Sequence, residues 1–154
     1  AYNFGEALVK IPGLDGSGKM GKSEGNAILL ADPPEVIRKK VMRAVTDSGP
    51  TEKNQEKPEP IQNLFTLMNV VSSAETVSHF EGAYNDCSIR YGDLKKQLAE
   101  DIIAFTTPFR EKILRLSEDD DYLRKITSEG AQVARESARN TIREVREIIG
   151  FKAF

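Results

Sequence analysis

A stretch rich in glycine and lysine near the start of the chain holds the residues best suited to chemistry. Residues 16–23 read Gly-Ser-Gly-Lys-Met-Gly-Lys-Ser, which places Lys19 and Lys22 on either side of Gly21. Lysine ammonium groups stabilise the negative charge of phosphates, and glycines allow the backbone to come close to the same anion. The stretch therefore predicts a loop that binds the phosphates of a nucleotide.

The same residues fit the P-loop pattern G-x-x-x-x-G-K-S, whose backbone amides surround nucleotide phosphates. That motif lies between a strand and a helix, because the helix N-terminus completes the phosphate site. Here Gly25, Asn26 and the apolar run 27–31 follow Ser23 closely, so no such helix is predicted. A P-loop ATP- or GTP-binding protein stays open as an alternative, although this context does not favour it.

A second interpretation takes the loop together with its flanks. Lys19-Met20-Gly21-Lys22-Ser23 resembles the KMSKS signature of class I aminoacyl-tRNA synthetases, with Gly21 where the signature has serine. Six further segments resemble the tryptophanyl-tRNA synthetase family in the same order, namely residues 10–16, 24–26, 44–47, 91–95, 103–110 and 130–150. The resemblance covers essentially the whole chain and is more specific than the P-loop pattern.

The resemblance implies that the loop acts when an amino acid is activated with ATP. Lys19 and Lys22 are the implied catalytic residues, because cations stabilise the charge that grows as pyrophosphate leaves. The implied ATP- and pyrophosphate-binding residues are Ile11, Lys19, Met20, Gly21, Lys22 and Ser23. Ile11 would lie beside the adenine through its backbone. The resemblance also implies Mg²⁺ that bridges the phosphates, and the sequence offers no set of protein ligands for a metal.

The activity implied is that of a tryptophan–tRNA ligase, which activates tryptophan with ATP and charges tRNA(Trp). The family's HIGH motif and amino-acid pocket lie in an N-terminal Rossmann half, and neither is found in this sequence. The chain also opens on Ala1 without an initiator Met. We therefore expect the C-terminal portion of a longer enzyme, inactive alone and without tightly bound ATP or Mg²⁺. The parent is expected to be a homodimer, and a monomer stays open for this portion.

Composition changes near residue 32, because six of the eleven glycines precede it and a helical pattern follows. We predict a mainly α fold. The resemblance implies that residues 1–31 are a Gly-rich remnant of an α/β Rossmann catalytic domain, and the segment 7–11 could be a strand. Residues 32–154 would be a helical bundle, which the resemblance implies to be of the anticodon-binding type.

Capping and periodicity predict the helices. The first would be capped by Asp32 and end near 47–50, where Asp47 would serve as a turn residue. The second would span 61–71, and residues 72–75 offer a capping box for a third. A long helix would start at Asp93 and kink at Pro108. Residues 117–121 would end it, and a short helix through 122–126 and a last one over 129–149 would follow. The aromatic core candidates are Phe65, Phe105 and Phe109.

Four arginines of the last predicted helix fall within roughly 80° of helical arc. They are Arg135, Arg139, Arg143 and Arg146. Such a ridge suits the phosphates of tRNA. The alternative is that their stems cover the edge of the core and their charges pair with Glu136 and Glu147. The basic face over residues 38–43 has similar alternatives: it is an ordinary solvated face, or it lies along the tRNA or steadies the loop.

Composition excludes several classes of protein. Twenty-two basic and 24 acidic residues give a net charge of −2, which excludes a strongly basic nucleic-acid coat. No apolar run approaches the ~20 residues of a membrane span, and no signal peptide opens the chain. The lone Cys87 cannot form an internal disulfide, and the lone His79 argues against a catalytic triad. Cytoplasm is therefore expected, and a non-catalytic helical RNA-binding module is a third interpretation.

Overall fold

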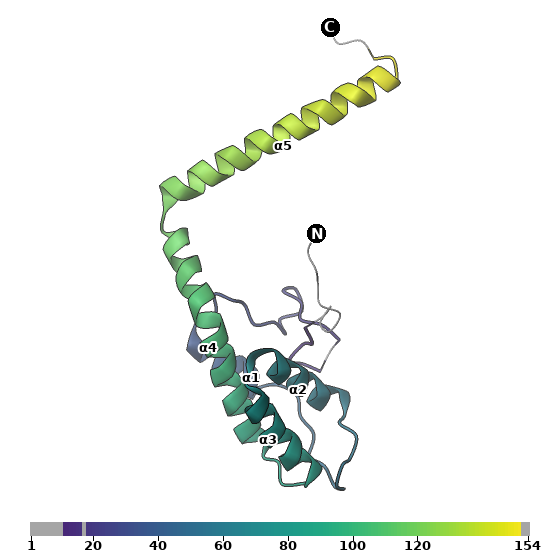
Figure 1. Ribbon diagram of the computed structural model, residues 1–154, viewed down its shortest axis with the longest axis vertical. Coiled ribbons are helices and arrows are strands. Elements are labelled where there is room, and N and C mark those ends of the chain that lie inside the picture. The colour runs from purple at the N-terminus through teal and green to yellow at the C-terminus, as the bar shows by residue number, and fades with distance from the viewer. Residues whose placement is uncertain (1–10, 17, 152–154) are drawn as a thin grey trace. The chain divides into compact units, whose positions relative to one another are not determined.

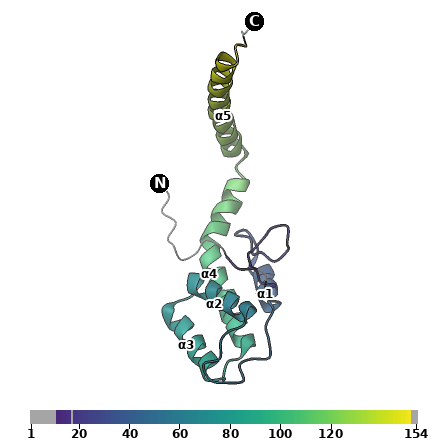
Figure 2. The same cartoon turned by 90° about the vertical axis from the view of Figure 1, so that its right-hand side faces the viewer.

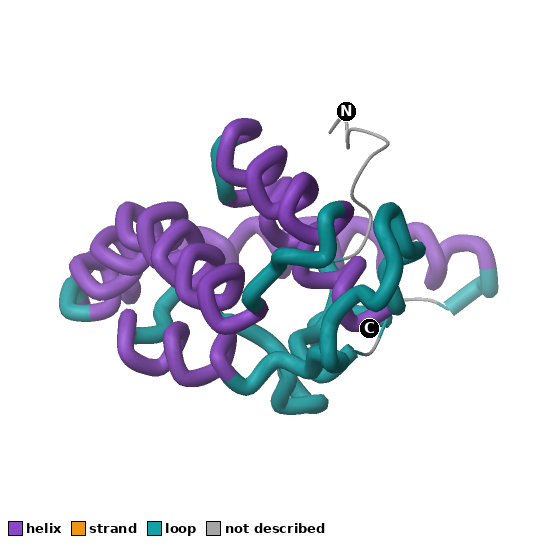
Figure 3. Tube along the Cα trace, turned by 90° about the horizontal axis from the view of Figure 1, so that it is seen from below, coloured by secondary structure: helices purple, strands orange, loops and turns teal. Residues whose placement is uncertain are grey.

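The computed structural model describes residues 11–16 and 18–151, and those residues form helices and loops with no strand (Figure 3). The mainly helical prediction is confirmed. The strand predicted at 7–11 lies outside the described residues except for Ile11, which is in a loop. By its contacts the chain divides into two compact units, residues 1–110 and 111–154. No helix of the described part is long and apolar enough to cross a membrane.

The first unit contains α1 (Pro34–Met42), α2 (Glu59–Val71), α3 (Ala74–Asn85) and most of α4 (Tyr91–Ser117). Figures 1 and 2 show α1, α2 and α3 gathered around the N-terminal part of α4. Prolines in their first turns start α1 and α2, where the missing N–H has no helical partner to lose. A serine of the predicted segment 72–75 caps α3, but it is Ser73, whose Oγ accepts the N–H of Thr76 at 3.2 Å, and the capping box of Ser72 with Glu75 is not formed.

Every helix of the first unit contributes to one apolar core. At its centre Phe65 and Tyr84 meet edge to face, with ring centroids 6.1 Å apart and planes at 81°. The Lys57 ammonium lies 4.8 Å from the Phe65 centroid and 5.0 Å from that of Tyr84. The other buried side chains of the core are Leu14, Ile37, Val41, Ala44, Ile61, Leu64, Leu67, Met68, Phe80, Leu94, Leu98, Ala99 and Ile102. Leu14 joins this core from the glycine-rich loop, so the loop and the bundle fold together.

Phe105 and Phe109 are not core residues, contrary to the sequence prediction. They are 44% and 46% exposed and contact each other with ring centroids 5.6 Å apart. The buried line of α4 recurs at every fourth residue and ends at Thr106. Phe105 lies about 20° from Leu94 and Leu98 in helical angle, on the same side of α4, but seven residues beyond Leu98 along the helix. Helix α4 itself continues through Pro108.

Both ends of α1 differ from the prediction. Pro33 is the N-cap residue, and the Asp32 carboxylate accepts the N–H of Leu29 at 2.9 Å instead of capping the helix. The helix ends at Met42 rather than near 47–50, because the N–H of Val45 bonds to the carbonyl of Leu14 at 3.1 Å. A tertiary hydrogen bond thus replaces the next helical one. The turn role of Asp47 is confirmed, since it accepts the Gly49 N–H at 2.9 Å.

The second unit holds the end of α4 and all of α5 (Asp120–Ile148). The break predicted at 117–121 is confirmed, and Asp119 caps α5 by accepting the Tyr122 N–H at 2.9 Å. The prediction of two helices beyond this break was wrong, because α5 is continuous through Gly130. A single glycine costs a helix only about 1 kcal/mol, too little to break one of this length. No described side chain of α5 is buried.

The Phe65 ring offers a test of the core. Phe65→Ala removes a fully buried ring and its contact with Tyr84, and we expect the free energy of unfolding to fall by about 3–5 kcal/mol. Phe105→Ala is the matched control, because that ring is 44% exposed. Urea unfolding of both variants measures the difference. Equal losses in the two variants would contradict this assignment of the core.

Candidate functional site

The glycine-rich loop is closed at its base by two backbone hydrogen bonds. The N–H of Met20 donates to the carbonyl of Ile11 at 2.7 Å, and the N–H of Leu14 donates to the carbonyl of Asn26 at 3.3 Å. The first bond brings Ile11 next to Met20 and its neighbour Lys19. The next helix after the loop is α1, which starts at Pro34. The helix that a P-loop places directly after its Lys-Ser pair is therefore not formed among the described residues.

A tight turn forms the tip of the loop. The N–H of Glu24 donates to the carbonyl of Gly21 at 3.1 Å, and Lys22 and Ser23 are exposed in the turn. A Cβ atom on Gly21 would lie 2.6 Å from Cγ of Glu24. The glycine that replaces the signature serine thus fits this turn, whereas any larger residue would have to displace the Glu24 side chain.

One buried amide side chain holds the loop together from within. Asn26 is 7% exposed, and its Oδ1 accepts the N–H of Gly21 at 2.8 Å. Its Nδ2 donates to Oδ1 of Asp15 at 3.0 Å and to the carbonyl of Lys19 at 3.2 Å. Asn26 lies in one of the segments that carry the resemblance, but the sequence gives no sign of this role. An asparagine after a glycine carries no signal that distinguishes a buried tertiary partner from a turn residue.

The loop forms one wall of a largely apolar groove within the first unit. Of the six predicted nucleotide-binding residues, Ile11, Lys19 and Met20 line this groove. The opposite wall consists of Ile28, Leu30, Leu67, Val71, Ile102, Phe105 and Thr106. Gly21, Lys22 and Ser23 lie at the turn and do not line the groove. The loop therefore presents an exposed pair of lysines, one at an apolar groove and one at the tip.

Lysines of α1 and α4 fix the segments that flank the loop. The Lys40 ammonium donates to the carbonyl of Ala27 at 2.9 Å and to Asp32 at 2.6 Å. Lys95 is 8% exposed, and its ammonium donates to the carbonyl of Ala44 at 2.7 Å and to Thr46 Oγ1 at 3.1 Å. Burial lowers the pKa of Lys95. Since Val45 lies between these two partners and bonds to Leu14, α4 anchors the base of the loop.

The basic face of α1 is not simply solvated. Arg38 makes a bidentate ion pair with Glu100 of α4, at 2.6 and 2.9 Å, although both side chains are about half exposed. This pair raises the pKa of Arg38 and lowers that of Glu100. Lys40 steadies the segment after the loop, so at this position the structure supports the steadying role. Of this face, Lys39 and Arg43 are exposed and form no side-chain hydrogen bond or ion pair within the described part of the chain.

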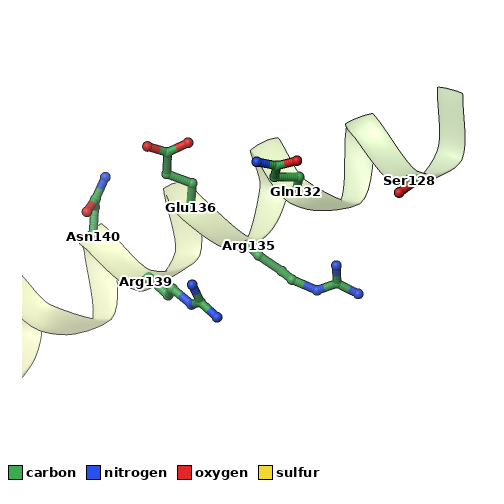
Figure 4. A pocket seen from close by; sticks show the side chains of 6 residues that line it. All are labelled: Ser128, Gln132, Arg135, Glu136, Arg139 and Asn140. Atoms are coloured by element: carbon green, nitrogen blue, oxygen red, sulfur yellow. The ribbon is translucent and has the colours of Figure 1, made fainter. Parts of the chain in front are cut away.

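The four predicted arginines lie along α5 in the second unit. Figure 4 shows Arg135 and Arg139 extending to one side of the helix and Glu136 and Asn140 to another. In the part of the chain that the structure describes, none of the four forms an ion pair, and Arg143 makes only a 3.5 Å contact with Asn140 Oδ1. The neighbouring apolar stripe is exposed, with Ile142 at 48%. The ridge is thus open to an anionic partner within its unit.

A metal centre is not built by the described residues, which contain no group of three or more His, Cys, Asp or Glu side chains able to hold an ion. The exposed Cys87 and the exposed His79, whose ring contacts Phe80, stand apart from the loop in sequence. The chemistry of the site is therefore that of two ammonium groups, a hydroxyl and backbone N–H donors. This donor set suits a polyanion such as the phosphates of a nucleotide.

Comparison with known proteins identifies the family. The model for class I tRNA synthetases of the tryptophan and tyrosine type matches residues 8–107, which include the loop and most of the first unit. The chain belongs to this synthetase family.

Two curated relatives of this synthetase chain are tryptophan–tRNA ligases. It is 60% identical over 152 residues to the tryptophan–tRNA ligase of Porphyromonas gingivalis, covering 99% of this chain and 46% of that protein. It is 38% identical to tryptophan–tRNA ligase 1 of Streptomyces coelicolor, covering 86% of this chain and 39% of that one. The synthetase chain thus spans less than half the length of these curated relatives.

A solved structure shares its fold. The tryptophanyl-tRNA synthetase of Campylobacter jejuni, crystallised with ADP and tryptophan, matches with a TM-score of 0.73 and 28% sequence identity. The match covers 94% of this synthetase chain and 44% of the other chain. The helices and the loop described above therefore have a counterpart in a known synthetase structure.

Lys95 makes a pH-dependent contribution to the stability of this anchor. Burial holds its pKa below the ordinary value of 10.5, so at alkaline pH the unfolded chain binds more protons than the folded one. The stabilisation is greatest above the unfolded pKa and is lost as the pH falls through the folded pKa. We expect the unfolding free energy of the wild type, minus that of Lys95→Met, to rise with pH in the alkaline range below the ordinary lysine pKa of 10.5.

Lys96→Met is the control for this measurement, because the neighbouring lysine is 72% exposed and pairs weakly with Asp93 at 3.7 Å. Chemical denaturation at several pH values gives both differences. The burial of the Lys95 ammonium group would be contradicted if the difference in unfolding free energy between the wild type and Lys95→Met did not change with pH. It would also be contradicted if the difference for Lys96→Met rose equally.

Proposed function

We propose that this chain is the part of a tryptophan–tRNA ligase that stabilises departing pyrophosphate and holds tRNA(Trp). The observation that carries the proposal is the ordered loop with exposed Lys19 and Lys22, inside the segment that matches the synthetase family. The similarity to tryptophan–tRNA ligases and to a tryptophanyl-tRNA synthetase supports tryptophan as the amino acid. The enzyme would join tryptophan to ATP to form an adenylate and then transfer tryptophan to tRNA.

In the first step the tryptophan carboxylate attacks the α-phosphorus of ATP, and the bond to pyrophosphate breaks. Negative charge grows on the leaving oxygens, where a cation lowers the barrier most. Lys19 and Lys22 supply that charge, and Ser23 donates from its hydroxyl. Ile11, Met20 and Gly21 complete the ATP- and pyrophosphate-binding residues that we propose. Mg²⁺ would be carried by the phosphates and neutralise part of their charge.

The proposal concerns the full-length enzyme, since the chain spans less than half of its relatives. We propose that residues 1–31 belong to the end of the catalytic domain and residues 32–154 to a tRNA-binding helical domain. The isolated chain is expected to be inactive and to hold no ATP or Mg²⁺ tightly. A homodimeric parent in the cytoplasm completes the proposal.

Lys22 is the direct test of the loop. In the full-length enzyme Lys22→Ala removes a transition-state cation, so we expect tryptophan-dependent ATP–pyrophosphate exchange to fall by about 10²–10³-fold. Lys53→Ala is the control, because Lys53 is 76% exposed in a loop between α1 and α2. Exchange is measured with tryptophan, with tyrosine and without amino acid.

Three results would contradict the proposal, two from that assay and one from a separate assay of ATP hydrolysis. Exchange supported by tyrosine rather than tryptophan would change the substrate. Absence of exchange from the folded wild type would favour a non-catalytic RNA-binding module. Hydrolysis of ATP by the isolated chain, dependent on Lys22, would favour a P-loop protein.

The arginine ridge of α5, defined by Arg135, Arg139, Arg143 and Arg146, is proposed to contact the tRNA backbone. A protein that neutralises one phosphate fewer shows a shallower dependence of affinity on salt. We expect Arg139→Gln to weaken tRNA(Trp) binding by the full-length enzyme and to reduce the salt slope by about 1. Binding is measured by filter retention over a range of salt concentrations.

Arg90→Gln is the matched control, since Arg90 is exposed in the first unit just before α4. The ridge would be excluded from the tRNA interface if Arg139→Gln and Arg90→Gln gave the same affinity and the same slope as the wild type.

A further inference from the structure

Asn26 occupies an unusual place for a polar side chain, because it is buried inside a loop whose working residues are exposed. It is one of three buried polar or charged side chains in the described part of the chain, with Lys95 and Thr106. Both ends of its amide are used. Oδ1 accepts the N–H of Gly21 at 2.8 Å, and Nδ2 donates to the carbonyl of Lys19 at 3.2 Å and to Asp15 at 3.0 Å.

These contacts require an amide. A primary amide combines an acceptor oxygen with two donor hydrogens, whereas an ionised carboxylate of the same shape can only accept. Aspartate at position 26 would lose both donated bonds and would bring a second negative charge next to Asp15. Alanine would leave the Gly21 N–H and the Lys19 carbonyl without this partner, and an unpaired buried polar group is costly.

The two backbone groups that Asn26 binds lie on either side of Met20, between the two lysines. Holding the Lys19 carbonyl and the Gly21 N–H at the same amide fixes the path of the chain from one lysine to the other. Gly25 directs the amide inward, since it precedes Asn26 with a φ of 69°, a conformation that glycine adopts without strain. The turn of Lys22 begins at Gly21, so its direction also depends on this bond.

We propose that Asn26 is a positioning residue that sets the placement of Lys19 and Lys22 for the pyrophosphate. This inference rests on the proposed function of the loop. Asn26 acts on the activation step alone, because pyrophosphate has left before tryptophan passes from the adenylate to tRNA. It has no effect on the affinity for tryptophan, whose carboxylate reacts at the α-phosphorus and not at the phosphates that the lysines contact.

The experiment uses the full-length enzyme with Asn26→Ala, Asn26→Asp and a control, Asn69→Ala. Asn69 is exposed on α2 and makes one local bond from Nδ2 to the Phe65 carbonyl at 2.9 Å. We expect kcat for ATP–pyrophosphate exchange to fall by about 10²-fold in Asn26→Ala and at least as far in Asn26→Asp. The KM for tryptophan and the rate of transfer from preformed adenylate to tRNA stay within about twofold of the wild type, as do all parameters of Asn69→Ala.

A double variant separates positioning from a general loss of structure. If Asn26 acts through Lys22, the combined Lys22→Ala and Asn26→Ala variant exchanges at least about tenfold faster than the product of the single effects predicts. Multiplicative effects would overturn the inference, and so would an equal fall in the transfer rate. A wild type without exchange would overturn the proposed function as well, whereas normal exchange in Asn26→Ala beside a slow Lys22→Ala would overturn this inference alone.

Discussion

A long loop without regular secondary structure must find partners for its backbone polar groups, and the first unit depends on how this is done. Buried N–H and carbonyl groups are almost always paired in folded proteins. Between Ile11 and α1 part of the pairing comes from side chains. Asn26 binds backbone groups inside the loop, and Lys40 donates to a backbone carbonyl in the segment after it. Lys95 donates to the backbone carbonyl of Ala44, just beyond α1. Each of these side chains replaces a hydrogen bond that a helix or sheet would have supplied.

The core gives these polar anchors a fixed frame. Leu14 is buried among helical side chains while its carbonyl receives the Val45 N–H, so the loop is held by apolar and polar contacts at the same residue. Helix α4 contributes both kinds, with Leu94 and Leu98 in the core and Lys95 between them in sequence. The frame leaves the tip of the loop exposed, and an exposed tip can move without disturbing the core. This arrangement suits a loop that must meet and release an anion.

The small net charge of the chain does not show how its basic side chains are distributed. The net charge is only −2. Lys19 and Lys22 are exposed on the loop, while Lys40, Lys57 and Arg38 are engaged with carboxylates within the first unit. On α5 the arginine ridge has no carboxylate partner among the described residues. Several basic groups of the first unit are thus paired with carboxylates, whereas the loop lysines and the arginine ridge, which are proposed to meet phosphates, form no ion pair among the described residues.

The sequence by itself determined the helical class, most helix positions and the placing of two lysines in a glycine-rich loop, because these follow from local signals. Proline at helix starts, the acidic break at 117–121 and the spacing of Lys19 and Lys22 are readable within a few residues of chain. The resemblance to the synthetases was readable for the same reason, since the signature and its flanks are short ordered motifs.

Tertiary structure decided the rest. Several features depend on what the folded chain places beside a residue. They are the early end of α1, the exposure of Phe105 and Phe109, the ion pair of Asp32 with Lys40 and the role of Asn26. A helical period identifies the side of α4 on which Phe105 lies, but it gives no sign of which turns of that side the rest of the chain covers. An asparagine or lysine likewise gives no sign of whether it will reach water or a backbone carbonyl, because that choice is set by what the folded chain places within about 3 Å of it.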